Sequence, residues 1–193
     1  MDTLKSFETE LVSLIGKPTG LRPFVCEGSP LECDAFVVGI NPATSMSADF
    51  WQFWRSDYGF DKAAWFEAYL QYRKLQPMKP GKTRRNSVSN TRRVIDWILE
   101  EASPVRCLET NIYAAPTEQA VDLQSELRIS APFDYLLEKL QPRLIVVHGE
   151  EAASHIQSKN YTGQIIKVSH LSRGWSQVAA RELGLQIKQK CKD

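Results

Sequence analysis

Short apolar runs alternate along the chain with longer segments in which apolar residues recur at helical spacing. Four runs predict strands: AFVVG (35–39), VRCLETNIY (105–113), RLIVVHG (143–149) and QIIKVSH (164–170). The first and third are continuously apolar and rich in Val and Ile, which is typical of strands buried on both faces. The pattern therefore predicts a sheet with at least two interior strands.

Segments with helical spacing lie before, between and after these strands. The first is amphipathic and places four residues on one face: Leu4, Phe7, Leu11 and Leu14. The others span residues 61–75, 90–102, 132–142, 150–158 and 174–184. We predict Asn90 as an N-cap and Gly184 as the residue that closes the last helix.

Strands that alternate with helices at this spacing predict the α/β class, with a mainly parallel sheet covered on both faces. No internal repeat and no linker-like segment divides the 193 residues, so we expect one domain over residues 1–193. In such sheets, ligands bind beyond the carboxyl ends of the strands. The residues to inspect are therefore those just past each apolar run: Asn41-Pro42, Asn111, His148 and His170.

These residue types suit the recognition and release of a nucleobase. The Asn111 amide presents donors and an acceptor in a plane, as the edge of a base does. Asn41 can hold a water without deprotonating it, which suits a reaction with a cationic transition state, such as cleavage of an N-glycosidic bond. His170 can donate to an oxygen that gains negative charge as a base leaves.

Each of these residues also has a purely structural interpretation. Asn41-Pro42 is a common turn dipeptide, and Asn111 can cap its strand. His148 is predicted to be structural, and the two interpretations of His170 are evenly matched. The aromatics of residues 50–54 have the spacing of a helix face packed on the core.

Charge is unevenly distributed, although the net charge is only +1. Residues 71–93 contain eight Lys or Arg and no acid. This segment is either a phosphate-binding element or a solvated loop, and the sequence favours neither.

No metal or cofactor is expected. The cysteines Cys26, Cys33, Cys107 and Cys191 are scattered, without a CxxC pair. No apolar run approaches the ~20 residues of a membrane span, and the acidic N-terminal segment is unlike a signal peptide. We expect a cytoplasmic protein without a membrane interaction.

Four segments together resemble the uracil-DNA glycosylase superfamily: VVGINPAT, LETNIYAAP, LIVVHG and VSHLSRGW. The nearest branches are the mismatch-specific and single-strand-selective monofunctional glycosylases, which have Gly-x-Asn-Pro in the first motif. The resemblance covers residues 24–185 and implies a three-layer α/β/α domain with a four-stranded parallel sheet. It also implies a flipped base held at the rim of the sheet.

The resemblance assigns roles to individual residues. Asn41 corresponds to the residue that positions water, and His170 to the histidine that stabilises the leaving base. The backbone near Ile40 would face the base, Asn111 would read its Watson–Crick edge, and Phe50 or Trp51 would stack on it.

The implied partner is DNA, single-stranded or with an unpaired base, or a free nucleobase or nucleotide, bound by a monomer. The predicted DNA-binding residues come from the basic segment and from the second motif: Lys82, Arg84, Arg85, Arg92, Arg93, Ser172 and Arg173.

The second motif departs from the family. It reads HLSRGW instead of His-Pro-Ser, and a helix is predicted where the family has a loop that wedges into duplex DNA. Arg173 is the side chain left for insertion. This departure favours a single-stranded or unpaired target, and it also favours the alternative of a superfamily member that binds without cleaving.

The first motif is followed by Asp49–Trp54 where the family has a Gly-rich turn, so the accepted base does not carry over. Asp49 and Glu109 near the rim have two interpretations. Either is a stronger water activator than Asn41, or, as we expect, both are solvated carboxylates.

Overall fold

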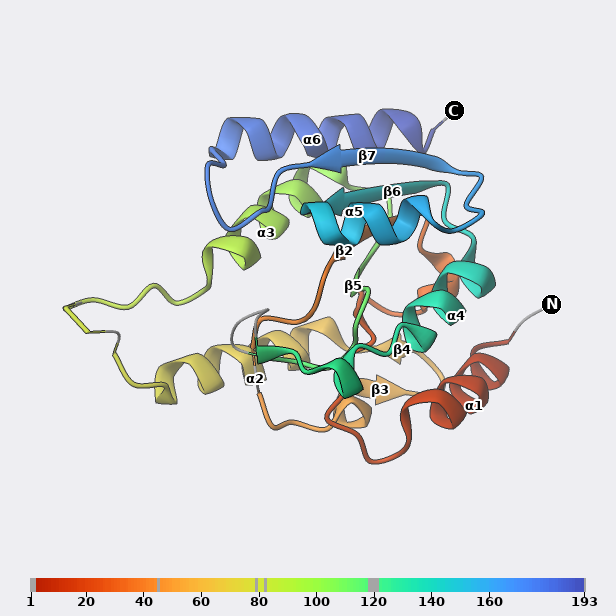
Figure 1. Cartoon of the computed structure of the whole chain (residues 1–193), viewed down its shortest axis with the longest axis horizontal. Coiled ribbons are helices and arrows are strands. Elements are labelled where there is room, and N and C mark those ends of the chain that lie inside the picture. Colours follow the sequence, from red (N-terminus) through yellow and green to blue (C-terminus); the bar gives the residue numbers. More distant parts are fainter. Residues whose placement is uncertain (1–2, 45, 79, 82, 118–121, 193) are drawn as a thin grey trace.

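The computed structural model describes residues 3–44, 46–78, 80–81, 83–117 and 122–192. In this part of the chain, five strands form one sheet in the order β1-β5-β2-β6-β7 (Figure 1). Their bounds are β1 Phe24–Val25, β2 Ala35–Gly39, β5 Cys107–Asn111, β6 Leu144–His148 and β7 Gln164–Val168. β5, β2, β6 and β7 run parallel, and β1 is antiparallel to β5.

The expected four-stranded sheet is thus wrong by one strand. β1 pairs Phe24 with Thr110 and Val25 with Glu109. The Thr110 hydroxyl also donates to the Pro23 carbonyl at 2.6 Å, which fixes this edge. A two-residue strand has too few positions to show an alternating pattern, so the sequence carries no signal for it.

The described helices are α1 Leu4–Ile15, α2 Lys62–Leu75, α3 Asn90–Ala102, α4 Ala131–Leu140, α5 Glu150–Gln157 and α6 Gln177–Lys190. Short 3-10 turns occur at η1 Pro30–Glu32, η2 Phe50–Phe53 and η4 Ser125–Leu127, and a small hairpin joins β3 Trp54–Arg55 to β4 Gly59–Phe60. No helix within the described residues has the length and apolarity to cross a membrane.

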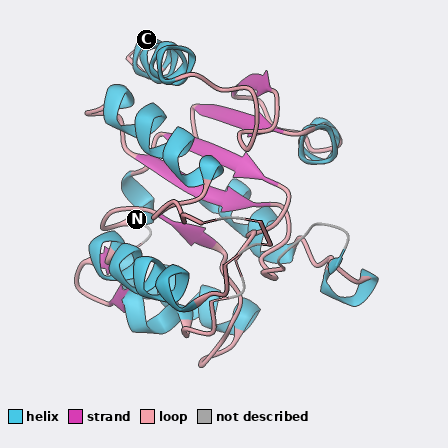
Figure 2. Cartoon of the chain, turned by 90° about the vertical axis from the view of Figure 1, so that its left-hand side faces the viewer, coloured by secondary structure: helices cyan, strands magenta, loops and turns pink. Residues whose placement is uncertain are grey.

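Helices cover both faces of the sheet, which gives the layered α/β arrangement expected from the alternation (Figure 2). Residues Phe36 and Val38 of β2 pack with α1, α4 and α5 in one core. Ala35 and Val37 pack with α3 and α6 in the other. This alternation follows from the period of two along a strand.

Two predicted helix ends are wrong. The N-cap of α3 is Ser89, whose hydroxyl accepts from the Arg92 N–H, and Asn90 is already helical. Gly184 lies inside α6, where a Cβ would come within 2.5 Å of the Ile98 carbonyl oxygen. This glycine therefore permits close packing of α6 on α3 and does not end the helix.

The predicted apolar face of the first helix is right except at its end. Phe7 and Leu11 are buried as expected, but Leu14 is 40% exposed and Ile15 is buried in its place.

The parallel strands place their carboxyl ends at one edge of the sheet. The arrowheads of β6 and β7 point toward the side that carries the α2–α3 and β7–α6 connections (Figure 1). The residues that follow each strand are thus brought to a common rim, as expected for this class of sheet.

Candidate functional site

Gly39, the last residue of β2, is flanked by two polar side chains from the neighbouring strands. It pairs in register with Asn111 of β5. A Cβ at Gly39 would lie 2.7 Å from the Asn111 amide oxygen and 2.9 Å from Nε2 of His148. Real Cβ atoms do not approach other atoms so closely, so a glycine is required for Asn111 and His148 to converge at this point.

His170 completes this group. The rings of His148 and His170 meet edge to face, with centroids 4.9 Å apart. Gly149 lies beside this pair with φ at +89°, a conformation that favours glycine, and a Cβ there would be in ordinary contact with His170 Cδ2 at 3.5 Å. The structure therefore brings together Asn111, His148 and His170, which come from three different strand ends.

His148 is the more deeply buried of the two histidines, with 7% of its surface exposed. Burial, together with the nearby His170, lowers the pKa of His148 to about 4, so the ring is neutral at pH 7. Its Nδ1 atom is buried and has no hydrogen-bond partner within the described residues. An unpaired buried nitrogen at a strand end is unusual in a residue that serves only the core.

The local loop fixes the tautomer of His170. The Ser172 N–H donates to His170 Nδ1 at 3.2 Å, and the Ser172 hydroxyl lies 2.8 Å from the same nitrogen. Burial lowers the pKa of His170, and the Arg173 guanidinium lowers it further. The neutral ring therefore carries its proton on Nε2, which leaves that atom as a donor.

Asn41 is oriented by the segment that follows β5. Its Nδ2 donates to the Thr117 hydroxyl at 2.7 Å. The two segments are also joined through the backbone, because the Thr117 N–H donates to the Pro42 carbonyl at 3.0 Å. With Nδ2 engaged, the amide oxygen of Asn41 is the atom left to accept from a water molecule.

Ile40 and Arg22 support the same loop. The Ile40 carbonyl accepts from the Tyr113 N–H at 2.9 Å, and its side chain packs against the α1–α4–α5 core. Arg22 is buried and donates through Nη2 to the Met46 carbonyl at 2.8 Å. Arg22 was not predicted from the sequence, since a single Arg in a Pro- and Gly-rich loop gives no signal that it is buried.

Phe50 and Trp51 do not form an aromatic wall of the site. They are only 3% and 7% exposed, and both belong to η2. Phe50 stacks on Phe60, and the Trp51 indole N–H donates to the Gly16 carbonyl at 2.7 Å. This packing contradicts the predicted stacking role for either ring and supports the core interpretation, although in a 3-10 turn.

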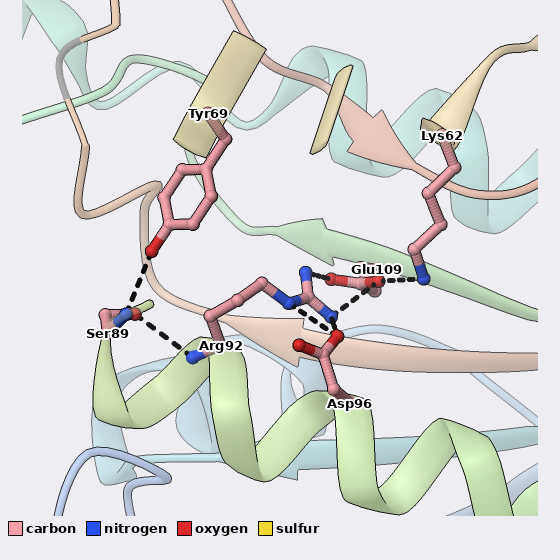
Figure 3. A network of polar contacts seen from close by, with 6 residues as sticks. All are labelled: Lys62, Tyr69, Ser89, Arg92, Asp96 and Glu109. Carbon is pink, nitrogen blue, oxygen red and sulfur yellow. Dashed lines mark hydrogen bonds and ion pairs between the residues drawn. The ribbon is translucent and has the colours of Figure 1, made fainter. Parts of the chain in front are cut away.

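Glu109 lies two residues before Asn111 and is held by two cations (Figure 3). Lys62 Nζ lies 2.8 Å from its carboxylate, and the Arg92 guanidinium binds both carboxylate oxygens. Burial alone raises the pKa of Glu109, but the charges of Arg92 and Lys62 outweigh it and lower the pKa to about 2. Both sequence interpretations of Glu109 are wrong, since the carboxylate is neither solvated nor basic enough to activate water.

Asp49 caps a turn. Its Oδ1 accepts from the Trp51 N–H at 3.2 Å and from the Thr19 N–H at 2.9 Å. The Asp49 carboxylate thus fixes η2 against the loop before β1, which is neither of the two roles considered for it.

The basic residues predicted to bind phosphate separate into distinct groups. Arg92 is 6% exposed and is held by Glu109 and Asp96 (Figure 3), so its prediction as a phosphate ligand is wrong. Arg85 donates to the Arg73, Lys74 and Gln76 carbonyls at the end of α2. Arg84 is exposed and forms no ion pair with a described residue. Lys82 lies outside the described residues.

Arg93, Ser172 and Arg173 lie together. They line a cleft of about 390 Å³ between the first turns of α3 and the β7–α6 connection. This cleft adjoins His170 through Ser172, whose hydroxyl contacts the ring.

No group of three or more His, Cys, Asp or Glu side chains within the described ranges has the arrangement of a metal site. No protein-family model matches the chain, and no curated protein matches its sequence significantly.

Asn111 and His170 offer a planar amide and a neutral imidazole with a donor on Nε2. Asn41, two residues beyond Gly39, offers an amide oxygen that can hold water. The sequence indicated Asn111, His170 and Asn41, but it gave no sign of the close approach at Gly39 or of the contact between His148 and His170. Once the strand order is known, the pattern at Gly39 can be interpreted. A glycine at the end of an apolar strand, between two strands that end in polar residues, indicates that those polar side chains approach each other.

Proposed function

We propose that the protein is a monofunctional DNA glycosylase of the uracil-DNA glycosylase type, which hydrolyses the N-glycosidic bond of a deaminated or modified base in single-stranded or unpaired DNA. The observation that carries the proposal is the convergence of Asn111 and His148 at Gly39, with the ring of His170 packed against that of His148. The order and spacing of the four sequence motifs, which contain these residues, also support it.

In this mechanism the base lies against Asn111, whose amide reads its edge. The glycosidic bond breaks with its electron pair leaving on the base, and the sugar gains oxocarbenium character. His170, protonated on Nε2, donates a hydrogen bond to the oxygen on which negative charge collects. No proton needs to leave the histidine for this stabilisation.

Asn41 holds the nucleophile. Its amide oxygen accepts from a water molecule, while Thr117 fixes the amide by accepting from Nδ2. The water adds to the anomeric carbon and releases a proton to solvent, and the departing base anion takes up a proton from solvent, which leaves an abasic sugar and the free base. A weakly activated water suffices because the cationic sugar is the stronger electrophile.

A second candidate is a protein that binds a nucleobase, a nucleotide or a single strand without cleaving it. The short second motif favours it, because only residues 171–176 separate His170 from α6. Leu171, in the position next to the histidine, is fully buried and cannot insert into a duplex. Such a protein would use Asn111 and the basic residues but would have no need of Asn41.

Oligonucleotides with uracil, hypoxanthine, xanthine or an alkylated base separate the two candidates. Single-stranded and duplex forms are incubated with the protein, and abasic sites are detected by alkaline cleavage. We expect base release from single strands that falls at least a hundredfold in Asn41→Ala and His170→Ala. The exposed Asn160→Ala variant is the matched control. Binding without release from any substrate would replace the glycosylase with the binding protein.

A further inference from the structure

The cleft beside His170 has two walls of complementary chemistry. One wall is a face of α3, formed by Asn90, Arg93 and Trp97 at spacings of three and four. The other is the β7–α6 connection, which contributes Ser172, Arg173 and Trp175. The cleft has a volume of about 390 Å³, which lies in the range of small-ligand sites, so it has room for one nucleotide.

The charge of the cleft favours an anion. Arg93 and Arg173 both line it, and neither forms an ion pair with a carboxylate of the described residues. No acidic side chain appears among the described residues of its lining. The cleft also opens at the N-terminal end of α3, where the helix dipole adds positive potential.

Two indole rings make the cleft suitable for a base as well. Trp97 and Trp175 are both only partly buried, unlike Phe50 and Trp51. The Trp175 indole N–H is buried and has no acceptor within the described residues. Stacking of a base on an aromatic side chain, combined with Arg–phosphate pairing, is the usual means of binding single strands.

The cleft and the candidate site share a residue. Ser172 lines the cleft and contacts His170 Nδ1 through both its N–H and its hydroxyl. The side-chain amide of Asn90 reaches the Ser172 carbonyl at 3.5 Å, which links the two walls next to the histidine. An occupant of the cleft is thus a direct neighbour of a base bound at His170.

We propose that this cleft binds the nucleotide adjacent to the target base in single-stranded DNA. Arg93 and Arg173 pair with its phosphate, and its base stacks on the indole rings of Trp97 and Trp175. A base that is paired in a duplex is not free to enter, so the cleft selects single strands. This inference rests on the proposed function and adds to the same site a subsite for the neighbouring nucleotide of the strand.

Fluorescence anisotropy with a labelled single-stranded oligonucleotide across a series of NaCl concentrations tests the cleft. The Arg93→Gln/Arg173→Gln double variant is compared with Arg55→Gln/Arg181→Gln, which removes the same charge from exposed positions outside the cleft. We expect the cleft variant to bind at least tenfold more weakly at low salt. Its salt slope should fall by about 1.4, that is, about 0.7 for each lost contact.

Trp97→Leu tests stacking separately from charge. We expect binding to weaken by about five- to a hundredfold with an unchanged salt slope. Circular dichroism checks that this variant folds. If it does not fold, the comparison of the Arg93→Gln/Arg173→Gln and Arg55→Gln/Arg181→Gln double variants still tests the cleft. Equal binding by the cleft and control double variants, or no single-strand binding by the wild type, would overturn the proposal.

Base release, measured on the same variants, keeps the two proposals distinct. Cleft-dependent binding of single strands without base release supports the cleft and rejects the glycosylase. Base release that depends on Asn41, with unchanged binding in the cleft variants, supports the glycosylase and rejects the cleft.

Discussion

The amide oxygen of Asn111 lies only 2.7 Å from the position that a Cβ on Gly39 would occupy. The two residues are register partners on adjacent parallel strands. The missing side chain on β2 is therefore what allows the polar side chains of β5 and β6 to approach each other at the rim.

Gly39→Ala is expected to destabilise the fold and to disrupt the site. The methyl group must displace Asn111 and His148, and such overpacking typically costs about 1–3 kcal/mol of unfolding free energy. Base release or base binding should fall at least tenfold. Urea unfolding and the oligonucleotide assay measure the two effects. Gly20→Ala is the control, because nothing lies within 4 Å of a Cβ there; equal stability of the two variants would contradict the close approach.

Glu109→Gln is expected to lower the unfolding free energy by about 3–5 kcal/mol, because it leaves Arg92 and Lys62 without their buried counter-charge. The matched control is Glu32→Gln, which removes an exposed ion pair with Arg106 and should change the value by less than about 1 kcal/mol. Chemical denaturation compares them, and similar losses in both variants would show that the buried network is not a stability element.

Stability should decline as pH falls, in an upper window set by His148 and a lower window set by Glu109. The native pKa of His148 is about 4 and its ordinary value is 6.5, so between these values the unfolded state binds more protons. The unfolding free energy therefore falls as pH drops from about 6.5 toward 4, with His170 contributing in the same direction.

A second decline occurs where Glu109 protonates. Its native pKa of about 2 lies below the ordinary 4.5, so the stability it contributes is present above pH 4.5 and is lost toward pH 2. Denaturation at a series of pH values should show a shallower upper decline in His148→Gln and a shallower lower decline in Glu109→Gln. Unchanged profiles would show that these groups titrate normally.

Thr117→Val is expected to reduce kcat for base release by about tenfold with little change in KM. The substitution removes the acceptor for Asn41 Nδ2 and keeps the side-chain shape, so the amide loses its fixed orientation. Single-turnover and steady-state kinetics check this split. A raised KM with normal kcat would instead place Thr117 in substrate binding.

Arg84 and Arg85 should behave differently although they are neighbours. Arg84→Gln is expected to weaken single-strand binding and to lower the salt slope by about 0.7, as expected for one phosphate contact. Arg85→Gln should instead speed amide exchange at the end of α2, because Arg85 binds the carbonyls of Arg73, Lys74 and Gln76. Weaker binding in Arg85→Gln together with faster amide exchange in Arg84→Gln would contradict these different roles.

Part of the site could be read directly from the sequence. Apolar runs that end in Asn or His predicted which side chains follow the strands, and parallel pairing then required their carboxyl ends to share one edge. That is why the positions of Asn111 and His170 at this edge could be predicted without knowledge of the tertiary structure. The two-residue strand β1 was not predicted, because so short a strand shows no alternation of apolar and polar residues.

The sequence by itself determined the alternation of strands and helices and the polar residues at the strand ends, because both depend on local spacing. Only the tertiary structure decided which of these side chains are exposed to a ligand and which are held by other residues. Arg92 and Arg93 are adjacent in one basic segment, yet the first is buried against Glu109 and the second lines the cleft. Successive helical residues point about 100° apart, and which direction meets a carboxylate depends on strands distant in the sequence.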